Sequence, residues 1–454
     1  MALKQRIISE IYNDQTGEIL NQEIIEDKVI EPPKKIEDLG YDHQQQMTLL
    51  QRIQDSFLGA QSNIYDLPNR CEACGSEMRN YGSDASKFNS VFSDHKIRIA
   101  KRRCCNTGCR KVVVTTIQGL FGDYRHPDLV EMQTLLASKD SFVGAQKSLE
   151  IKNKKHRPVN GQLNIKRLIE RVGEVLHDIH QDKDSLEHFN IINVPELIIQ
   201  ADGGHIKDKH PSRASFEALL TKVYSPDDLV SHTSKTGNVI SEIISKSYAA
   251  SSYKDHHKTM KQMTLIAAMK QGLTKETSVT ALADGAKNCW NILKSLKPHC
   301  NSITYILDWY HIKKKFDTLI GQLDSKDAEE LESIKWKIWH GKQDDALTRL
   351  TALYGVLITT PFADKTHDLL KYISNNKDYL ANYEERKIQK KVFTSSVIES
   401  SIETVINERF KKKQKALWSR ETSHKILQVR TSTASHQWEI DWKLAKQKIY
   451  KIVA

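Results

Sequence analysis

The chain has 454 residues and carries 68 Lys and Arg against 57 Asp and Glu, a formal net charge of +11 at pH 7. Its 19 glycines and 10 prolines are few for this length, which favours a helix-rich protein of several domains over a repeat of short strands. The sequence shows no secretory leader and no run of about 18 apolar residues, so we expect a cytoplasmic protein that does not bind membranes.

The beginning of the chain is acidic, unlike the rest. Residues 1–50 contain ten Asp and Glu against five Lys and Arg, and Pro32-Pro33 interrupts any regular element there. We predict a helical or partly ordered extension over residues 1–67.

Five of the seven cysteines lie between positions 71 and 109. A Cys-x-x-Cys pair is followed about thirty residues later by Cys-Cys-Asn-Thr-Gly-Cys, and two such pairs on tight turns supply the four thiolates that structural zinc prefers. Cys105 could replace Cys104 as a ligand, or the thiols could be unrelated and buried. We predict a zinc ribbon over residues 68–125, with the ligands Cys71, Cys74, Cys104 and Cys109.

Basic residues surround this cluster and continue into the next region. Arg102 and Arg103 are candidates for contacts with DNA phosphates, although they could equally form a solvated basic face. Residues 126–188 have helical apolar spacing and contain the basic run 152–157. This region could be a DNA-binding helix-turn-helix or only a helical linker.

From residue 189, predicted strands alternate with predicted helices, which indicates an α/β layer arrangement. Three of these strands are expected to end in an acidic residue: Asp202 in QADGG, Asp284 in LADGA and Asp308 in ILDWYH. Carboxylates at the ends of neighbouring strands converge on one sheet edge, and Mg²⁺ or Mn²⁺ needs clustered oxygen ligands. Two such ions can assist phosphoryl transfer. Alternatively, the Asp-Gly pairs only mark turns.

The remaining sequence is predicted to be helical. Residues 320–390 contain no convincing strand, and the segment from 395 onwards is both helical and basic. Its Lys411, Lys412 and Lys413 are candidates for phosphate contacts, or they form a solvated face.

Four motifs follow one another in the second half of the chain. They are Asp202-Gly203, ADGAKNCW around Asp284, ILDWYH with Asp308 and His311, and VIESSIETVINERFKKKQKALWS with Glu399. This ordered set resembles the DDE transposases of bacterial insertion sequences, in the Mutator-like superfamily and closest to its Kra-type branch. The residues Lys287-Asn288-Cys289 before Trp290 depart from the apolar residues that are usual in the family at these positions.

The resemblance implies an RNase H-like catalytic core at 189–317 that is followed by an all-α insertion at 318–390. Residues 391–454 would then supply the helix with the catalytic glutamate and further basic helices. The small zinc and helical regions in front would bind DNA.

The resemblance also implies site residues and a cofactor. It assigns the catalytic triad to Asp202, Asp284 and Glu399, which would bind Mg²⁺ or Mn²⁺. His311, together with Asp308, would be auxiliary, or it only packs behind a helix cap formed by Asp308.

Helix geometry bears on the third carboxylate. At about 100° per residue, one stripe faces the core, and Glu399 lies nearer to it than Glu403 or Glu408. The predicted stripe comprises Ile398, Ile402, Val405, Ile406 and Arg409. Glu403 is the reserve candidate, and Glu399 could instead close a capping box with Ser396.

The implied function is a bacterial, nucleoid-associated transposase that binds the ends of its insertion sequence and catalyses metal-dependent DNA cleavage and strand transfer. Its partners would be the double-stranded terminal inverted repeats and target DNA, bound by a homo-oligomer. The alternatives are a catalytically silent or domesticated DNA-binding regulator, and an RNase H-fold nuclease without strand transfer.

Overall fold

The structure is a computed structural model that describes residues 3–62, 69–113, 116–152, 156–233, 239–394, 400–412 and 416–452. The chain divides into two compact units, Met1–Ile169 with Leu444–Ala454, and Glu170–Lys443. These divisions fall inside two helices, α5 (Gln162–Gln181) and α15 (Trp438–Ile449).

The first unit begins with an antiparallel hairpin of β1 (Leu3–Tyr12) and β2 (Ile19–Ile30), followed by α1 (His43–Ser62). The expectation of a helical or partly ordered extension is therefore wrong for residues 3–30. Ile7, Ser9 and Ile11 alternate with exposed residues, which is the period of a strand with one covered face. Ser56 of α1 contacts Ser9 at 3.0 Å between hydroxyl oxygens, so α1 covers that face.

The cysteine region forms a three-stranded antiparallel sheet of β3 (Met78–Asn89), β4 (Asp94–Cys104) and β5 (Val112–Val113). On β4, Ile97 and Ile99 are buried while their neighbours are more exposed, which is the period of a strand with one covered face. Helices follow where they are predicted: α3 (Pro127–Lys139), α4 (Phe142–Lys152) and α5. The short α2 (Ile117–Phe121) lies in the region predicted as zinc ribbon.

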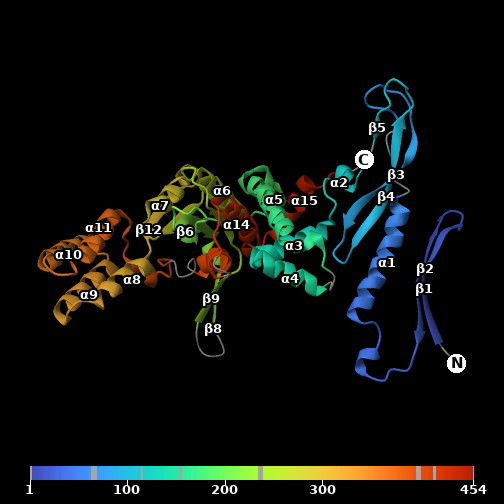
Figure 1. Ribbon diagram of the computed structural model, residues 1–454. Helices are drawn as coiled ribbons and strands as arrows, with labels where there is room; N and C mark the ends of the chain where they lie inside the picture. The colour runs from blue at the N-terminus through green and yellow to red at the C-terminus, as the bar shows by residue number, and fades with distance from the viewer. Residues whose placement is uncertain are drawn as a thin grey trace. The chain divides into compact units, whose positions relative to one another are not determined.

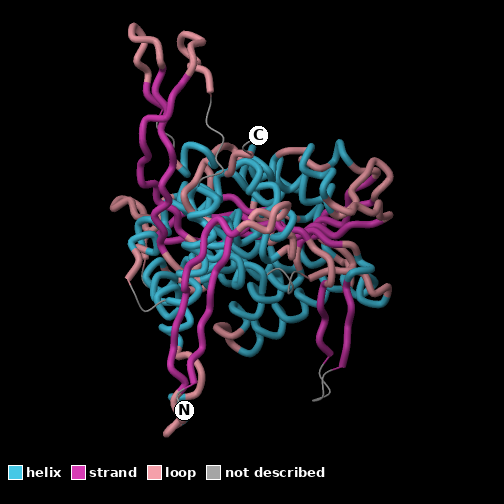
Figure 2. The backbone as a smooth tube through the Cα atoms, turned by 90° about the vertical axis from the view of Figure 1, so that its right-hand side faces the viewer, coloured by secondary structure: helices cyan, strands magenta, loops and turns pink. Residues whose placement is uncertain are grey.

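The second unit is built on a five-stranded mixed sheet in the order β10-β7-β6-β11-β12. Its strands are β6 (Glu196–Lys207), β7 (Ser215–Tyr224), β10 (Ser247–Ser251), β11 (Ser278–Ala283) and β12 (Ser302–Leu307). β6, β7 and β10 pair antiparallel, whereas β6, β11 and β12 pair parallel. A separate hairpin, β8 (Leu229–Thr233) with β9 (Val239–Ile243), projects from this unit (Figure 2).

Helices connect and cover these strands. α6 (Lys258–Lys270) and α7 (Lys287–Lys294) lie between β10, β11 and β12 in the chain. After β12, the described residues up to 394 contain helices and no strand, as the sequence predicts. These helices are α8 (Trp309–Ile320), α9 (Ser325–Trp339), α10 (Gln343–Leu357), α11 (Ala363–Asn375) and α12 (Tyr383–Ile388), of which α8 to α11 are gathered together in Figure 1.

The end of the chain is helical. A π-helix, η7 (Glu403–Lys412), precedes α14 (Arg420–Ala434) and α15. Four members of the predicted stripe are buried, namely Ile402, Val405, Ile406 and Arg409, whereas Ile398 lies outside the described residues. Over the part of the chain that the structure describes, no helix combines the length and apolar character needed to cross a membrane.

Candidate active site and candidate metal centre

Four cysteine sulfurs meet at the end of the β3–β4 sheet. The Sγ atoms of Cys71, Cys74, Cys104 and Cys109 all lie within 4.8 Å of one another. Two local turns produce this geometry: Gly75, at φ +71°, donates its N–H to the Cys71 carbonyl oxygen at 2.7 Å, and the Arg110 N–H reaches the Asn106 carbonyl oxygen at 2.9 Å. The cluster could hold a metal such as zinc.

The structure distinguishes between the two adjacent cysteines. Cys104 is buried in the cluster, whereas the side chain of Cys105 is exposed and does not belong to it. The choice of Cys104 as the cluster member is therefore confirmed. Four thiolates would leave no open coordination position, so the group fits a structural metal and not a catalytic one.

The two arginines proposed to contact DNA lie on β4 beside the cluster. Arg103 lies over the ring of Tyr81, with 5.0 Å from its guanidinium carbon to the ring centre, and Arg102 donates to Asn69. Both side chains are half-buried. Their contact with DNA stays a prediction.

The three acidic residues of the second unit follow one row of the sheet. Ala283 of β11 pairs with Ala201 of β6 on one side and with Leu307 of β12 on the other. Asp202, Asp284 and Asp308 each come directly after a member of this row. The register therefore brings all three residues to the same edge of the parallel part of the sheet.

One part of the prediction is wrong. β6 does not end at Asp202 but continues to Lys207, because its antiparallel pairing with β7 extends further than its parallel pairing with β11. Asp202-Gly203 is thus not a turn. Asp202 pairs with Leu220 inside the β6–β7 ladder, at the point where the ladder with β11 stops.

Asp284 lies in a tight connection between β11 and α7. Its Oδ1 atom accepts a hydrogen bond from the Ala286 N–H at 2.9 Å, and Gly285 adopts φ +98°. The Tyr372 hydroxyl of α11 donates to the Asp284 carbonyl oxygen at 2.8 Å. A helix far along the chain therefore supports the backbone of this carboxylate.

The structure adds a carboxylate that sequence analysis missed. A Cβ atom on Gly203 would lie 2.5 Å from Glu217 Oε1, so Glu217 of β7 packs over the residue after Asp202. Burial raises the pKa of the Cys289 thiol, and the charges of Asp284, Asp202 and Glu217 raise it further. The charges of all three carboxylates thus act on one buried thiol. No motif marks Glu217; only its strand register could have indicated it.

Asp308 and His311 form a pair at the beginning of α8. The buried Asp308 carboxylate accepts hydrogen bonds from the N–H groups of Tyr310 and His311 at 3.2 and 3.3 Å, which confirms its role as a helix cap. It also bonds His311 Nδ1 at 2.5 Å. Burial lowers the pKa of His311, but this bond and the charges of Asp308, Asp202 and Asp284 outweigh it and raise the pKa. The charges of both proposed metal ligands thus act on His311.

The proposed third ligand, Glu399, lies outside the described residues, as do Ser396 and Lys413. The helix that follows packs directly on β6, because a Cβ atom on Gly204 would lie 3.1 Å from the Cγ2 atom of Ile406. Gly204 is two residues after Asp202. The helix that follows the proposed glutamate in the chain thus lies beside the strand with the first aspartate.

Glu403, the reserve candidate, has other partners. Its carboxylate pairs with Lys412 and accepts a hydrogen bond from Asn407 at 2.9 Å. Its pKa is lowered, first by the bond from Lys412 and then by that from Asn407. Lys411 and Lys412 are both exposed, and their binding to DNA stays a prediction.

Asp202 and Asp284 offer the oxygen donors that Mg²⁺ or Mn²⁺ prefers. Among the described residues, however, the cysteine cluster is the one set of three or more His, Cys, Asp or Glu ligand atoms within 4.8 Å. Asp202 and Asp284 thus fit two of the oxygen ligands of a Mg²⁺ or Mn²⁺ site. A complete site requires at least one further ligand.

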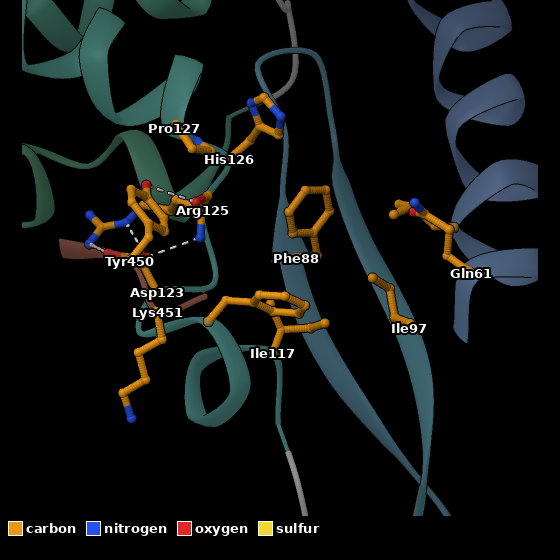
Figure 3. A pocket seen from close by; sticks show the side chains of 12 residues that line it. Gln61, Phe88, Ile97, Ile117, Asp123, Arg125, His126, Pro127, Tyr450 and Lys451 are labelled. Carbon is orange, nitrogen blue, oxygen red and sulfur yellow. Dashed lines mark hydrogen bonds and ion pairs between the residues drawn. The ribbon is translucent and has the colours of Figure 1, made fainter. Parts of the chain in front are cut away.

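A pocket of about 560 Å³ in the first unit is separate from both centres (Figure 3). Its wall is mostly apolar, with Phe88 and Ile117 among its members. The buried Asp123 carboxylate is already bound by Arg125 in a bidentate pair at 2.8 and 2.9 Å, so this wall presents no free acid for chemistry.

Neither the models of known protein families nor the sequences of curated proteins match this chain.

Proposed function

We propose that the protein is a metal-dependent DDE transposase. The observation that carries the proposal is the placement of Asp202 and Asp284 directly after the last paired row of two neighbouring parallel strands. The described residues of the four ordered motifs that resemble the family lie on this sheet or follow it in the chain. We infer an RNase H-like core from the same sheet, in which β6, β7 and β10 are antiparallel and β11 and β12 parallel to β6.

The carboxylates would bind the metal through oxygen atoms. Asp202, on the central strand, Asp284 and Glu399 would hold the metal. The bound ions would supply activation of the attacking oxygen and stabilisation of the leaving oxygen. The helix after Glu399 packs on Gly204 through Ile406, which supports a position of Glu399 near Asp202.

Other parts of the chain would hold the DNA. The β3–β4 sheet with its cysteine cluster carries Arg102 and Arg103, and α3 to α5 form the helical region that was predicted to bind DNA. Phosphate contacts by such basic groups are independent of sequence. We propose the terminal inverted repeats and the target DNA as substrates, bound by more than one copy of the chain.

The test uses the full-length protein with DNA that carries the inverted repeats flanking its gene. Asp202→Asn and Asp284→Asn should abolish Mg²⁺-dependent cleavage and strand transfer but leave binding to the repeats intact. Asp227→Asn, an exposed residue of the same unit, is the matched control and should keep activity. Full activity in either variant overturns the two-metal site.

The wild-type products separate the proposal from its alternatives. Cleavage followed by joining to target DNA supports a transposase. Cleavage without joining indicates a nuclease, and binding without cleavage indicates a silent regulator.

A further inference from the structure

A groove of about 630 Å³ runs between α8 and α11. On α8 its wall includes His311, Lys314, Lys315, Thr318 and Leu319, whose spacing places them on one face of the helix. Gln322, just after the end of α8, also lines the groove. On α11 the wall includes Lys365. Both helices belong to the all-α region that follows the sheet.

One end of this groove lies at the candidate active site. His311, a wall residue, is bonded to Asp308 and feels the charges of Asp202 and Asp284. α11, the opposite wall, supports the Asp284 carbonyl oxygen through Tyr372. The same two helices therefore contact Asp308 and the backbone of Asp284, and they enclose the groove.

The rim of the groove is basic. Lys314, Lys315 and Lys365 are exposed there and face a single acid, Asp368. The acidic residue of α8, Asp317, does not line the groove, and it is already neutralised by Lys313 and Lys335, both at 2.8 Å. The positive charge of the rim is therefore not cancelled by its own helix.

The floor of the groove has a different chemistry. Leu319 and Leu369 line it and are each 4% exposed. Aliphatic side chains offer no hydrogen bonds to base edges, so the floor does not read a sequence through hydrogen bonds. Lysines at the rim and an apolar floor fit a polymer that carries regularly spaced anionic groups along one side and flat apolar groups along the other. A single nucleic-acid strand, with its phosphates and bases, has this chemistry.

We propose that the α8–α11 groove binds a single DNA strand next to the scissile phosphate, without sequence preference, through contacts of Lys314, Lys315 and Lys365 with its phosphates. The proposal rests on the proposed function, because it takes the strand to continue from the carboxylates. A positively charged groove that follows the backbone is how proteins bind single strands without sequence selection.

The test measures binding of a fluorescently labelled, mixed-sequence single strand to the full-length protein at several salt concentrations. The triple variant Lys314→Gln, Lys315→Gln, Lys365→Gln should bind more weakly and lower the salt slope by about 2, since each phosphate contact on a single strand contributes about 0.7. The matched control removes three exposed lysines of α8, α9 and α11 that do not line the groove: Lys313→Gln, Lys326→Gln and Lys371→Gln.

The outcomes separate this proposal from the proposed function. An unchanged salt slope in the groove variant, or an equal loss in the control, overturns the groove. Weaker binding of duplex DNA with unchanged single-strand binding also overturns it. Asp284→Asn should bind the single strand normally but not cleave. Failed cleavage by the wild-type protein with intact groove binding would count against the transposase and not against the groove.

Discussion

The side-chain amide of Asn288 donates a 2.5 Å hydrogen bond to the carboxylate of Glu217. The two residues are 71 positions apart and join α7 to β7 beside Asp202 and Asp284. Asn288 belongs to the stretch that departs from the apolar pattern of the transposase family. The polar side chain of Asn288 thus has a partner in this structure, the carboxylate of Glu217.

We predict that Glu217 positions the proposed catalytic site. Glu217→Gln should lower metal-dependent cleavage about 10–100-fold, the usual cost of losing a partner behind a metal ligand. Asn288→Leu should also lower metal-dependent cleavage, but by less, because it removes the hydrogen bond to the Glu217 carboxylate and leaves the carboxylate itself in place. The measurement is single-turnover cleavage across a Mg²⁺ titration. A purely structural role would lower the thermal midpoint and leave the Mg²⁺ dependence unchanged.

The cysteine cluster should bind zinc. Cys71→Ser should lose the metal and unfold the β3–β4 sheet, because metal binding in such modules supplies folding free energy. Cys105→Ser removes an exposed thiol outside the cluster and should keep a full equivalent of zinc. Metal content by mass spectrometry, with limited proteolysis of the sheet, checks both. Wild-type protein purified without zinc would contradict the prediction.

The third carboxylate should be Glu399. Glu399→Gln should abolish strand transfer and leave folding intact, because glutamine keeps a capping box but is a poor ligand for Mg²⁺. Glu403→Gln is the matched control, since Glu403 is bound to Lys412 and Asn407. Its activity should stay near that of the wild type. The reverse pattern in the cleavage assay would move the assignment by one helical turn.

Gly285 should be required for the Asp284 connection. Gly285→Ala should cost about 1–3 kcal/mol in the free energy of unfolding, because φ is +98° and the new Cβ atom would lie 2.8 Å from the Tyr372 ring. Gly355→Ala is the opposite case, since nothing lies within 4 Å of its Cβ position on α10. It should stabilise the helix by about 0.5–1 kcal/mol. Urea unfolding of both variants measures the difference.

His424 should make the second unit sensitive to acid. Its Nε2 atom lies 2.8 Å from His177 Nδ1, and burial, followed by the charges of His177 and His180, lowers the pKa of His424 to about 3. The unfolded chain, with an ordinary pKa near ~6.5, binds the proton more readily. The contribution of His424 to the free energy of unfolding is therefore complete above pH ~6.5 and declines as the pH falls toward 3.

At pH 5 the loss from this one group is about 2 kcal/mol. His424→Gln should show a smaller decrease in unfolding free energy between pH 7 and pH 5 than the wild type. Asp255 and Lys425, which also act on His424, stay in place in the variant. An identical decrease in both proteins would show that His424 is not the group that takes up the proton.

Several features follow from short stretches of sequence. Cys71 and Cys74 lie on one local turn, and the alternation at Ile97 and Ile99 is enough to identify a strand with one buried face. The buried stripe of Ile402 to Arg409 likewise follows from helical spacing. In each case the pattern and the structure it produces lie within a few residues, so no distant contact is needed to recognise them.

Tertiary structure decided what depends on distant partners. The end of β6 was misplaced because its extension to Lys207 exists only through pairing with β7. The unit boundary falls inside α5 because Gly173 packs so closely on the backbone of Lys425 that a Cβ atom would lie 2.2 Å from its carbonyl oxygen. Glu217 joins the carboxylates for the same reason: strand register and long-range packing, which no local pattern records, place its side chain over Gly203.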